Sequence, residues 1–443
     1  MSDRTLGELA GLLGGDLMGD PAAPCGRVVA DSREVGPGDL FIALEGRNTD
    51  GHSFVDEVLS LGGYALVRKN GWRSGVIVVE DPLHALWRGA RARRARLGSR
   101  VVGLTGSNGK TTTRELINAG LSGRLRVERS EKNYNNEIGL PLCLLNTSGD
   151  AEVLVLEMGM NHPGELAFLG SMAQPDITIV TSIGRAHMEY FENRDAIALA
   201  KSELLRATVR QGGCVIPVGE PMLRSAAEER DLSVITVGDG GDVWLEADRD
   251  GGVAMPWNLR IRLSVPGEHN RTNALFALAA CEMVGAPVSE CLEGMASYAG
   301  MAGRGRVTDG LSGVRVLDES YNANPDSTLA CLDELAGFSG ALGAVLGEMR
   351  ELGERSVDLH VEVLEHAATL GLRFLLLVGG DYRSALERAD WLDWGECEIA
   401  ACSDAEEAVL HVTRTVSAGD SVLVKGSHSV GLERVVAALV GGD

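Results

Sequence analysis

The segment VVGLTGSNGKTTT, residues 101–113, joins an apolar run to a glycine-rich turn, a lysine and three threonines. Backbone N–H groups of such a turn can surround phosphates, Lys110 can reach the terminal phosphates, and the Thr111 hydroxyl can hold Mg²⁺. The strict GxxxxGK[ST] spacing is broken, because Leu104 stands where the first glycine is expected and Gly103 comes one residue early. A plain strand-to-helix turn is the alternative, but it would not need this order of residues. The phosphate-binding residues that we expect are Thr105, Gly106, Ser107, Asn108, Gly109, Lys110, Thr111 and Thr112.

Two further polar residues follow apolar runs that are typical of strands. Glu157 lies near the end of VLVLEM, residues 153–158, and His187 comes just after ITIVTSIG, residues 177–184. Ligands of open α/β sheets collect beyond the carboxyl ends of the strands, so both side chains can converge on the edge marked by Lys110. A carboxylate suits Mg²⁺, whereas an imidazole is a softer ligand. Helix capping by Glu157 and a core or loop position for His187 are the alternatives.

Asparagines are concentrated in two segments. NYNNEIGLP, residues 133–141, lies between two secondary elements, and its amides suit a polar substrate such as a sugar or a peptide backbone. An asparagine-rich turn is the alternative. GEHNRTN places Asn270 and Asn273 one helical turn apart and facing the same way, although Asn270 could instead cap the helix. The substrate residues that we expect in the first segment are Asn133, Asn135, Asn136 and Glu137.

The last third of the chain holds LDESYNANPDS, which follows a strand-like run. Its side chains could contact a nucleotide ribose and base, and the alternative is an Asx/Pro turn with a helix cap at Ser327. Lys425, in LVKGSHS, could bind a substrate carboxylate, or it could be a solvated strand end. Lys201 lies in the apolar stretch AIALAKSELL, from which lysine side chains usually extend to solvent. The residues expected at the ribose and base are Asp318, Glu319, Tyr321 and Asn322.

Composition limits the classes of function. The 443 residues carry a formal net charge of -22, which disfavours general binding to nucleic acids or anionic membranes. No apolar run approaches the roughly 20 residues that span a bilayer, and charges interrupt the first residues, so we expect a cytoplasmic protein. The eight cysteines form no CxxC pair and no zinc spacing, and we interpret them as reduced core thiols.

These residues require elements that position them, and the order of apolar runs predicts an α/β fold with three domains. Residues 1–98 read as a small mixed α/β domain that ends in an arginine-rich stretch, residues 88–100, interpreted as a solvated helix face. Strands alternate with helices in residues 99–303, which predicts a P-loop domain with a mostly parallel sheet and a hairpin-like stretch near 230–265. The alternation resumes in residues 304–443, which predicts a Rossmann-like domain.

Together these motifs resemble the ATP-dependent Mur ligases of peptidoglycan precursor synthesis, over the whole length of the chain. NYNNEIGLP and SYNANPDS are similar to the branch of the family that adds D-alanyl-D-alanine. The remaining matching motifs are DSR at 31–33, LFIALEGRNTDGHSF at 40–54, TGSNGKTTT, EMGMNHPGE, AHMEYF, GEHNRTNALFALAA, GRGR, GEMRELGERS and LVKGSHS.

The resemblance implies a role for each matching residue. The N-terminal domain would bind a UDP-sugar, the central domain ATP and two Mg²⁺ ions, and the C-terminal domain the incoming amino substrate. Glu157 and His187 would lie around the metal ions, with Thr111 and with Lys201 if that lysine is carbamylated. Asn270 and Asn273 would lie beside adenine, and Arg304 would contact phosphate. The resemblance further implies UDP-sugar contacts at Ser32, Arg33, Phe41, Ala43, Gly46 and Asp50, and carboxylate contacts at Lys425 and Ser427.

The implied reaction is an ATP-dependent ligation through an acyl phosphate. It would join D-Ala-D-Ala to UDP-N-acetylmuramoyl-tripeptide and release the pentapeptide product, ADP and phosphate, in support of cell-wall synthesis, cell shape and division. The domains would close on their ligands, and we expect a monomer. A sibling ligase that adds one amino acid, a folylpolyglutamate-synthase-like enzyme and a nucleotide-regulated binding protein remain the alternatives.

Three departures from the family pattern leave details open. DES replaces the usual DDS, so either Asp318 or Glu319 could take the ribose role. LGEM replaces the commoner GDM. SHS replaces SRS, which puts the partly charged His428 where an arginine is usual beside Lys425. The sequence also leaves open whether the third residue of the stem peptide is diaminopimelate or lysine.

Overall fold

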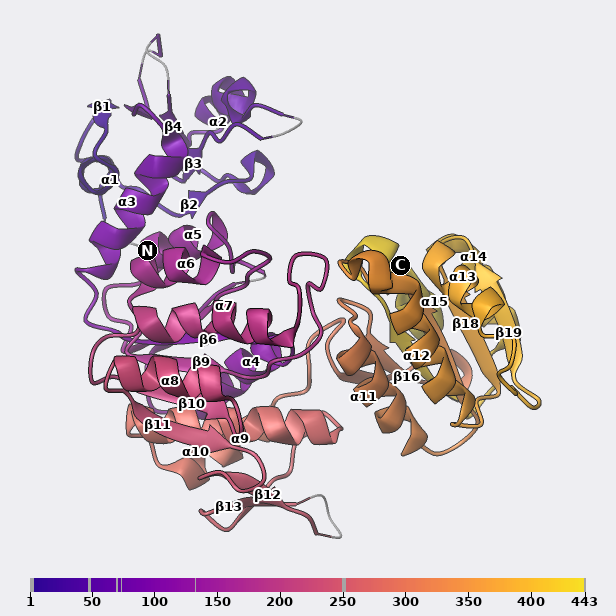
Figure 1. Ribbon diagram of the computed structural model, residues 1–443. Coiled ribbons are helices and arrows are strands. Elements are labelled where there is room, and N and C mark those ends of the chain that lie inside the picture. The colour runs from indigo at the N-terminus through magenta and orange to yellow at the C-terminus, as the bar shows by residue number, and fades with distance from the viewer. Residues whose placement is uncertain are drawn as a thin grey trace.

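The computed structural model describes residues 4–46, 49–68, 71–72, 74–131, 133–248 and 252–441. Figure 1 shows an N-terminal unit above a central unit, with a C-terminal unit at its side. The major sheet of each unit draws its strands from one of the three ranges expected from the sequence. The α/β fold with three domains is confirmed, and 1–98, 99–303 and 304–443 remain our proposed boundaries.

The N-terminal unit is a five-stranded sheet with the order β1-β5-β4-β3-β2, in which only β1 runs antiparallel to its neighbour. Its first helix begins at a capping box, in which Thr5 and Glu8 satisfy each other's backbone N–H groups. The strands are β1 (Asp16–Met18), β2 (Val28–Val29), β3 (Leu40–Ile42), β4 (Tyr64–Val67) and β5 (Val76–Val78). The helices are α1 (Leu6–Leu13), α2 (Val55–Ser60) and α3 (Pro82–Arg94).

The central unit is a six-stranded sheet with the order β11-β10-β9-β6-β8-β7, and all its pairings are parallel. Its four inner strands are mostly apolar because helices cover both faces, whereas the two edge strands are only partly buried. The strands are β6 (Arg100–Thr105), β7 (Val127–Arg129), β8 (Val153–Glu157), β9 (Ile177–Val180), β10 (Gly213–Pro217) and β11 (Ser233–Val237). The helices are α4 (Lys110–Leu121), α5 (Gly139–Asn146), α6 (Glu165–Ala173), α7 (Arg194–Ala207), α8 (Pro221–Glu229), α9 (Glu268–Val284) and α10 (Val288–Met295).

The hairpin-like stretch expected near 230–265 is correct only in its second part. A three-stranded antiparallel sheet follows there, made of β12 (Trp244–Glu246), β13 (Val253–Met255) and β14 (Leu259–Arg260). Strand β11, by contrast, pairs in parallel with β10 and extends the main sheet. Strand β11, with the sequence SVITV, lies at the edge of the sheet and is only partly buried. Its sequence therefore lacks the continuous apolar run that marks the inner strands.

The C-terminal unit is a six-stranded sheet with the order β15-β16-β20-β17-β18-β19, and only β15 is antiparallel. Alternate residues of β18 enter different cores: Leu375 and Leu377 pack in one, Phe374 and Leu376 in the other. The strands are β15 (Arg306–Asp309), β16 (Arg315–Glu319), β17 (Leu342–Gly347), β18 (Phe374–Val378), β19 (Glu398–Cys402) and β20 (Ser421–Lys425). The helices are α11 (Pro325–Ala336), α12 (Ser356–Ala368), α13 (Gly380–Arg388), α14 (Ala405–Thr415) and α15 (Glu433–Val440).

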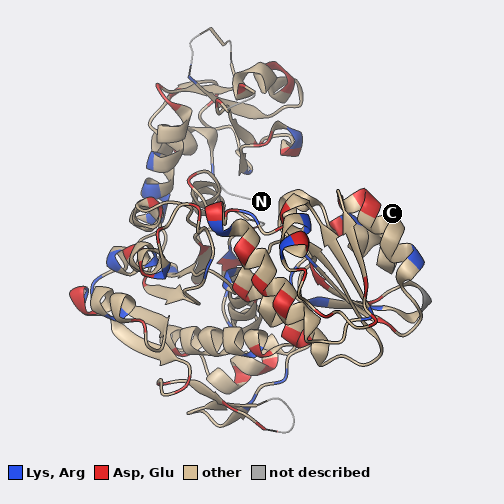
Figure 2. Cartoon of the chain, turned by 45° about the vertical axis from the view of Figure 1, so that its right-hand side comes forward, with Lys and Arg blue, Asp and Glu red and all other residues tan. Residues whose placement is uncertain are grey.

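The solvated helix face expected for residues 88–100 is wrong for much of α3. Figure 2 shows basic residues along this helix. Three of its arginines donate to carbonyls of neighbouring elements: Arg88 Nε to Leu13 O (3.1 Å), Arg93 Nη2 to Thr147 O (2.6 Å) and Arg94 Nε to Ala173 O (2.7 Å). The arginines therefore satisfy carbonyls at the ends of α1, α5 and α6, and they fasten α3 to both the N-terminal and the central unit.

Among the described residues, no helix combines the length and apolar character required to cross a bilayer. All eight cysteines are free thiols. Six of them are buried, and Cys143 and Cys397 are partly exposed, so the interpretation as core thiols holds for most of the set.

Candidate functional site

The strand order of the central sheet creates the site. Strand β6 lies between β8 and β9, because the chain runs from β6 to the edge strand β7, returns to β8, and then crosses to β9 on the other side. Ligands bind at such a reversal, beyond the carboxyl ends of the strands. The loop after β6 is consequently flanked by the ends of β8 and β9, where Glu157 is the last residue of β8 and His187 follows β9.

The loop after β6 requires glycine at two positions. Gly106 has φ +153°, and a Cβ there would lie 1.9 Å from Thr181 Oγ1. Gly109 has φ +81°, and a Cβ there would lie 2.2 Å from Asn273 Oδ1. An L side chain would therefore be strained at both positions and would also collide with a neighbour. Helix α4 begins immediately afterwards without a side-chain cap, so its first N–H groups are available to an anion.

Lys110 lies inside this loop. Its Nζ donates to Gly106 O at 2.7 Å, across the loop that it follows. Burial lowers the pKa of Lys110, nearby Glu157 opposes that shift, and Arg304 adds to it. A phosphate group bound here would place a negative charge beside the Lys110 ammonium and would stabilise its protonated form.

Glu157, the last residue of β8, is held from three directions. Thr111 Oγ1 donates to its Oε2 at 2.9 Å, Arg114 Nη1 donates to the same oxygen at 3.1 Å, and Asn135 Nδ2 donates to Oε1 at 3.2 Å. The side chain of Glu157 is 3% exposed. The helix-capping alternative is not what the structure shows, because the donors are side chains of α4 and of the asparagine-rich segment.

The oxygen donors near Glu157 fit Mg²⁺. No group of three or more His, Cys, Asp or Glu side chains within the described ranges could hold a metal ion. Mg²⁺ usually takes only one or two carboxylates and completes its shell with water and phosphate oxygens. The hydroxyl of Thr111 and the carboxylate of Glu157, beside a loop that suits phosphates, form an open site of that kind.

His187 and Lys201 lie on the other side of the loop. His187 has a left-handed backbone (φ +60°), and its Nδ1 lies 2.5 Å from Glu351 Oε2 in the C-terminal unit. Lys201, on α7, is only 1% exposed, so the expected extension to solvent is wrong. Burial, and to a smaller degree nearby Lys110, lowers the pKa of Lys201 well below its usual value. The shift makes the neutral form of this amine easier to reach than in an exposed lysine.

The two asparagines of α9 lie beneath the loop. Asn270 Nδ2 donates to Pro266 O at 2.6 Å, and Asn273 Nδ2 lies 3.4 Å from Asn270 Oδ1. Both line the same cleft as the phosphate loop. Arg304 also lines it, with its guanidinium carbon 4.2 Å from the centre of the Tyr321 ring. The imidazole of His428 stacks on that ring at 5.2 Å.

At the carboxyl ends of β16 and β20, Asp318 and Glu319 differ in orientation. Asp318 accepts from Gly303 N at 2.6 Å and from Ser320 Oγ at 2.6 Å, so both its oxygens are engaged in a loop. Glu319 instead lines the cleft, and burial raises its pKa, although Lys425 and Arg304 oppose the shift. The Lys425 Nζ donates to Asn322 O at 2.9 Å and lies 3.8 Å from Glu319 Oε2.

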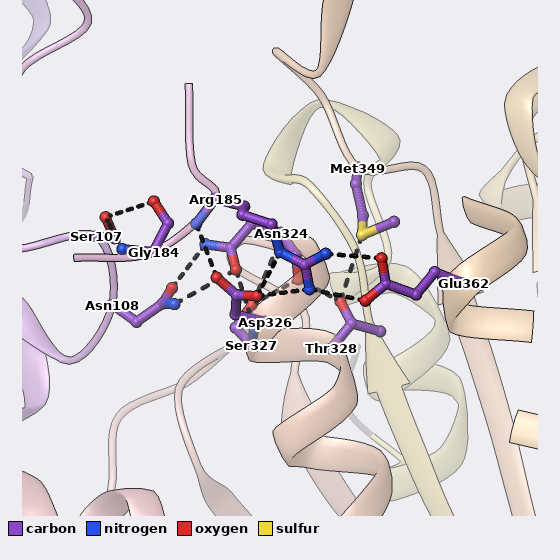
Figure 3. Close-up of polar contacts among 10 residues, drawn as sticks. All are labelled: Ser107, Asn108, Gly184, Arg185, Asn324, Asp326, Ser327, Thr328, Met349 and Glu362. Carbon is purple, nitrogen blue, oxygen red and sulfur yellow. Dashed lines mark hydrogen bonds and ion pairs between the residues drawn. The ribbon is translucent and has the colours of Figure 1, made fainter. Parts of the chain in front are cut away.

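The central and C-terminal units touch at the phosphate loop. In Figure 3, Asn324 Nδ2 donates to Asn108 Oδ1 at 2.6 Å, which joins the cap of α11 to the loop. Beside it, Arg185 Nε donates to Asp326 Oδ1 at 2.7 Å, and Arg185 Nη1 to Glu362 Oε2 at 2.6 Å. We call Arg185, Asp326 and Glu362 the interdomain ion pairs.

These elements enclose a cleft of about 1590 Å³. It contains most of the expected residues of the central and C-terminal units. They are Ser107, Asn108, Gly109, Lys110, Thr111, Thr112, Asn133, Asn135, Asn136, Glu137, Glu157, His187, Lys201, Asn270, Asn273, Arg304, Glu319, Tyr321, Asn322, Lys425 and Ser427. The expected residues of these two units that do not line it are Thr105, Gly106 and Asp318.

The expected UDP-sugar residues form a separate group on the N-terminal unit, outside this cleft. Phe41 and Ala43 are buried in a hydrophobic core, so only their backbone could face a ligand. Asp50 caps a 3-10 turn by accepting from His52 N at 3.0 Å. Ser32 and Arg33 lie in another 3-10 turn, where Arg33 pairs with Asp31, and Gly46 N donates to Thr49 O at 2.9 Å. Their role in binding the UDP-sugar stays a prediction.

Some residues of the cleft region were not singled out from the sequence. Arg114 contacts Glu157, Asn324 contacts Asn108, and Glu351 contacts His187. Arg114 directly follows the GKTTT motif, and the other two lie within SYNANPDS and GEMRELGERS, so the motifs were visible but the partners were not. Arg185 precedes AHMEYF and carried no signal of its own.

Comparisons with known proteins match this architecture. Residues 104–281 match the family described as the Mur ligase middle domain, and residues 303–428 match the family described as the Mur ligase, glutamate ligase domain. A UDP-N-acetylmuramoyl-tripeptide--D-alanyl-D-alanine ligase of Mycobacterium leprae is 33% identical, over 100% of this chain and 99% of the relative.

Solved structures agree over nearly the full length. A crystal structure of MurF from Acinetobacter baumannii has a TM-score of 0.85 at 30% identity and covers 99% of both chains. MurF ligase from Thermotoga maritima, solved in complex with ADP, has a TM-score of 0.80 at 30% identity and covers 93% of this chain and 96% of that one.

Proposed function

Because this chain belongs to the Mur ligase family, we propose that it joins D-alanyl-D-alanine to UDP-N-acetylmuramoyl-tripeptide in an ATP-dependent reaction. The products are the UDP-muramoyl-pentapeptide of peptidoglycan synthesis, ADP and phosphate. The observation that best supports this proposal is the single cleft in which the phosphate loop meets the carboxyl ends of β16 and β20. A ligase needs such a site because its nucleotide and its two substrates must meet there.

The reaction begins with a carboxylate, which is a poor electrophile until it is phosphorylated. In our proposal the loop N–H groups and Lys110 bind the ATP phosphates, and Arg304 approaches from the C-terminal side to neutralise charge on the transferring phosphoryl group. Thr111 and Glu157 would hold Mg²⁺, which would supply charge neutralisation at the phosphates. His187 and a carbamylated Lys201 would contribute to a second metal position.

The second step is attack of the D-Ala-D-Ala amine on the acyl phosphate. The amine nitrogen bonds to the acyl carbon, the C–O bond to the phosphate breaks as the tetrahedral intermediate collapses to an amide, and the amine proton leaves with the phosphate. Lys425 and Ser427 would hold the carboxylate of the incoming dipeptide, and the asparagine-rich segment would contact the stem peptide. Enclosure of the cleft by two domains keeps water from the acyl phosphate, which would otherwise hydrolyse.

The remaining residues would bind the nucleotide base, the ribose and the UDP-sugar. Asn270 and Asn273 would lie beside adenine. Glu319 is our choice for the ribose, because Asp318 is engaged in its loop whereas Glu319 faces the cleft. The uridine diphosphate would be bound by Ser32, Arg33, Asp50 and the backbone near Phe41, Ala43 and Gly46.

We also propose a cytoplasmic, monomeric enzyme, which cell fractionation and sedimentation would check.

The test is to incubate the protein with ATP, Mg²⁺, D-Ala-D-Ala and each of the two UDP-muramoyl-tripeptides, and to follow phosphate release and product mass together. We expect a pentapeptide product that requires both substrates and is lost in Lys110→Ala. The control is Arg126→Ala, which removes a side chain that is 61% exposed, pairs with Asp150 and does not line the cleft. The preferred tripeptide would show whether the third residue is diaminopimelate or lysine.

Phosphate release without a joined product would contradict the proposal and favour a nucleotide-regulated binding protein. A product formed from a single amino acid instead of D-Ala-D-Ala would favour a sibling ligase.

A further inference from the structure

Arg114 is a buried cation to which the proposed mechanism assigns no role. It lies on α4, three residues after Thr111, and its side chain is only 2% exposed. Burying a guanidinium without a partner is very costly in free energy. The partners of Arg114 therefore indicate its role in the fold.

The guanidinium of Arg114 bridges two carboxylates. Its Nε and Nη2 donate to Glu115 Oε1 at 3.0 and 2.8 Å, and its Nη1 donates to Glu157 Oε2 at 3.1 Å. Glu115 is fixed in turn by Arg129, whose Nε lies 2.9 and 2.8 Å from its two carboxylate oxygens. A line of contacts therefore leads from β7 through α4 to the end of β8.

Glu115 carries one negative charge and shares it between Arg114 and Arg129. The fork geometry of arginine, however, lets one edge bind Glu115 while the remaining nitrogen reaches Glu157. An ionised carboxylate offers about four lone-pair sites. Thr111, Arg114 and Asn135 use three of those on Glu157, so about one is left for a cation.

We propose that Arg114 is a positioning residue that, anchored by Glu115 and Arg129, fixes the orientation of the Glu157 carboxylate for Mg²⁺. The proposal rests on the proposed function, because it takes Glu157 as a metal ligand. Arg114 touches neither nucleotide nor metal in this arrangement. It acts by preventing rotation of Glu157, as hydrogen-bonding partners of metal ligands do in other metal sites.

The test measures metal binding as well as turnover. Mn²⁺ is used as the probe in the presence of ADP, with bound and free ion separated by electron paramagnetic resonance. Arg114→Lys keeps the charge but lacks the fork that reaches both carboxylates, and Arg126→Lys is the exposed control. We expect Arg114→Lys to weaken Mn²⁺ binding by about tenfold or more. Turnover should recover at high Mg²⁺, so the half-saturating Mg²⁺ concentration rises while kcat changes less.

Glu115→Gln separates positioning from packing, because it weakens the anchor but leaves the contact between Arg114 and Glu157. It should lower the unfolding temperature and change Mn²⁺ affinity less than Arg114→Lys does. Equal Mn²⁺ affinities in the wild type and Arg114→Lys would overturn the proposal. So would the failure of both Arg114→Lys and Arg114→Gln to fold. A wild type that binds no ADP with Mn²⁺ would instead contradict the proposed function.

Discussion

Lys110 and Lys201 both line the cleft, and the charge of Lys110 contributes to the lowered pKa of Lys201. Lys110 lies in the phosphate loop, and Lys201 is buried on α7. Burial is the main cause of the lowered pKa of Lys201, and the charge of Lys110 is the second. The lowered pKa raises the neutral fraction of Lys201, and only a neutral amine adds to carbon dioxide to form a carbamate. The environment of Lys201 is thus suited to the modification that the family resemblance implies.

We expect isotope-labelled bicarbonate to place a carbamate carbon on Lys201. Carbon-13 NMR should show one carbamate signal in the wild type and none in Lys201→Ala. Removal of bicarbonate should lower ligase activity, and its return should restore it. The matched control is Lys425→Ala, in which the signal should persist. A signal that survives in Lys201→Ala would show that the carbamate lies elsewhere.

Single substitutions can also show whether Asp318 or Glu319 binds the ribose. Glu319→Gln should raise the KM for ATP by about tenfold, which corresponds to roughly 1.4 kcal/mol for a lost hydrogen bond to a charged group. It should leave the unfolding temperature almost unchanged. Asp318→Asn should mainly lower the unfolding temperature, because Gly303 N and Ser320 would lose a charged acceptor. Kinetics and thermal unfolding of both variants check this, and the opposite pattern would assign the ribose to Asp318.

At the scale of elements, the junction between β6 and α4 shapes the proposed nucleotide site. The helix begins at Lys110 directly after a left-handed glycine, so no side chain covers its first N–H groups. Helix α9 packs against α4 and places Asn273 where a side chain at 109 would lie. The loop is therefore shaped by two helices and a strand rather than by its own residues alone.

Gly109→Ala should weaken ADP binding by about tenfold or more, because left-handed backbone strain of roughly 1–3 kcal/mol adds to a collision with Asn273. Isothermal titration calorimetry measures the effect. Gly123→Ala is the matched control, since no atom lies within 4 Å of a Cβ at that position. Similar ADP affinities in the two variants would mean that the loop tolerates a side chain at residue 109.

At the scale of the whole molecule, the C-terminal unit rests against the phosphate loop through a small number of polar contacts. Asn324 reaches Asn108, and Glu351 reaches His187. The interdomain ion pairs join the loop after β9 to α11 and α12 (Figure 3). Their side chains are between 27% and 39% exposed, so water and salt screen them. Such an interface can open, which fits the domain closure that we predict.

Arg185→Ala should shift the molecule toward a more open arrangement by about 1 kcal/mol, or roughly fivefold in population. Small-angle scattering of the protein without ligands should show a larger radius of gyration than the wild type. ATP analogue and UDP-sugar together should reduce the difference. The control is Arg210→Ala, whose partner Asp231 lies within the central unit. Scattering curves that do not change with Arg185→Ala or with ligands would contradict both the role of the ion pairs and closure itself.

Local sequence patterns were sufficient for much of this protein. Apolar runs followed by turns predicted most strands of the central and C-terminal sheets, because strands buried on both faces must be apolar. The turn GSNGKTTT predicted the phosphate loop, since its glycines, lysine and threonines act within one short segment. The edge strand β11 was misassigned because its residues are only partly buried and do not show that pattern.

Only the tertiary structure decided which side chains share the site. Arg185 pairs with Asp326 and Glu362, which lie 141 and 177 residues away in sequence. Arg114, on helix α4, contacts Glu157 at the end of β8, and Asp318 is engaged in a loop while the adjacent Glu319 lines the cleft. Residue types and spacing predict what chemistry a side chain can do. Its partners and its direction depend on how strands distant in sequence are ordered in the sheets, and that order is a property of the folded chain.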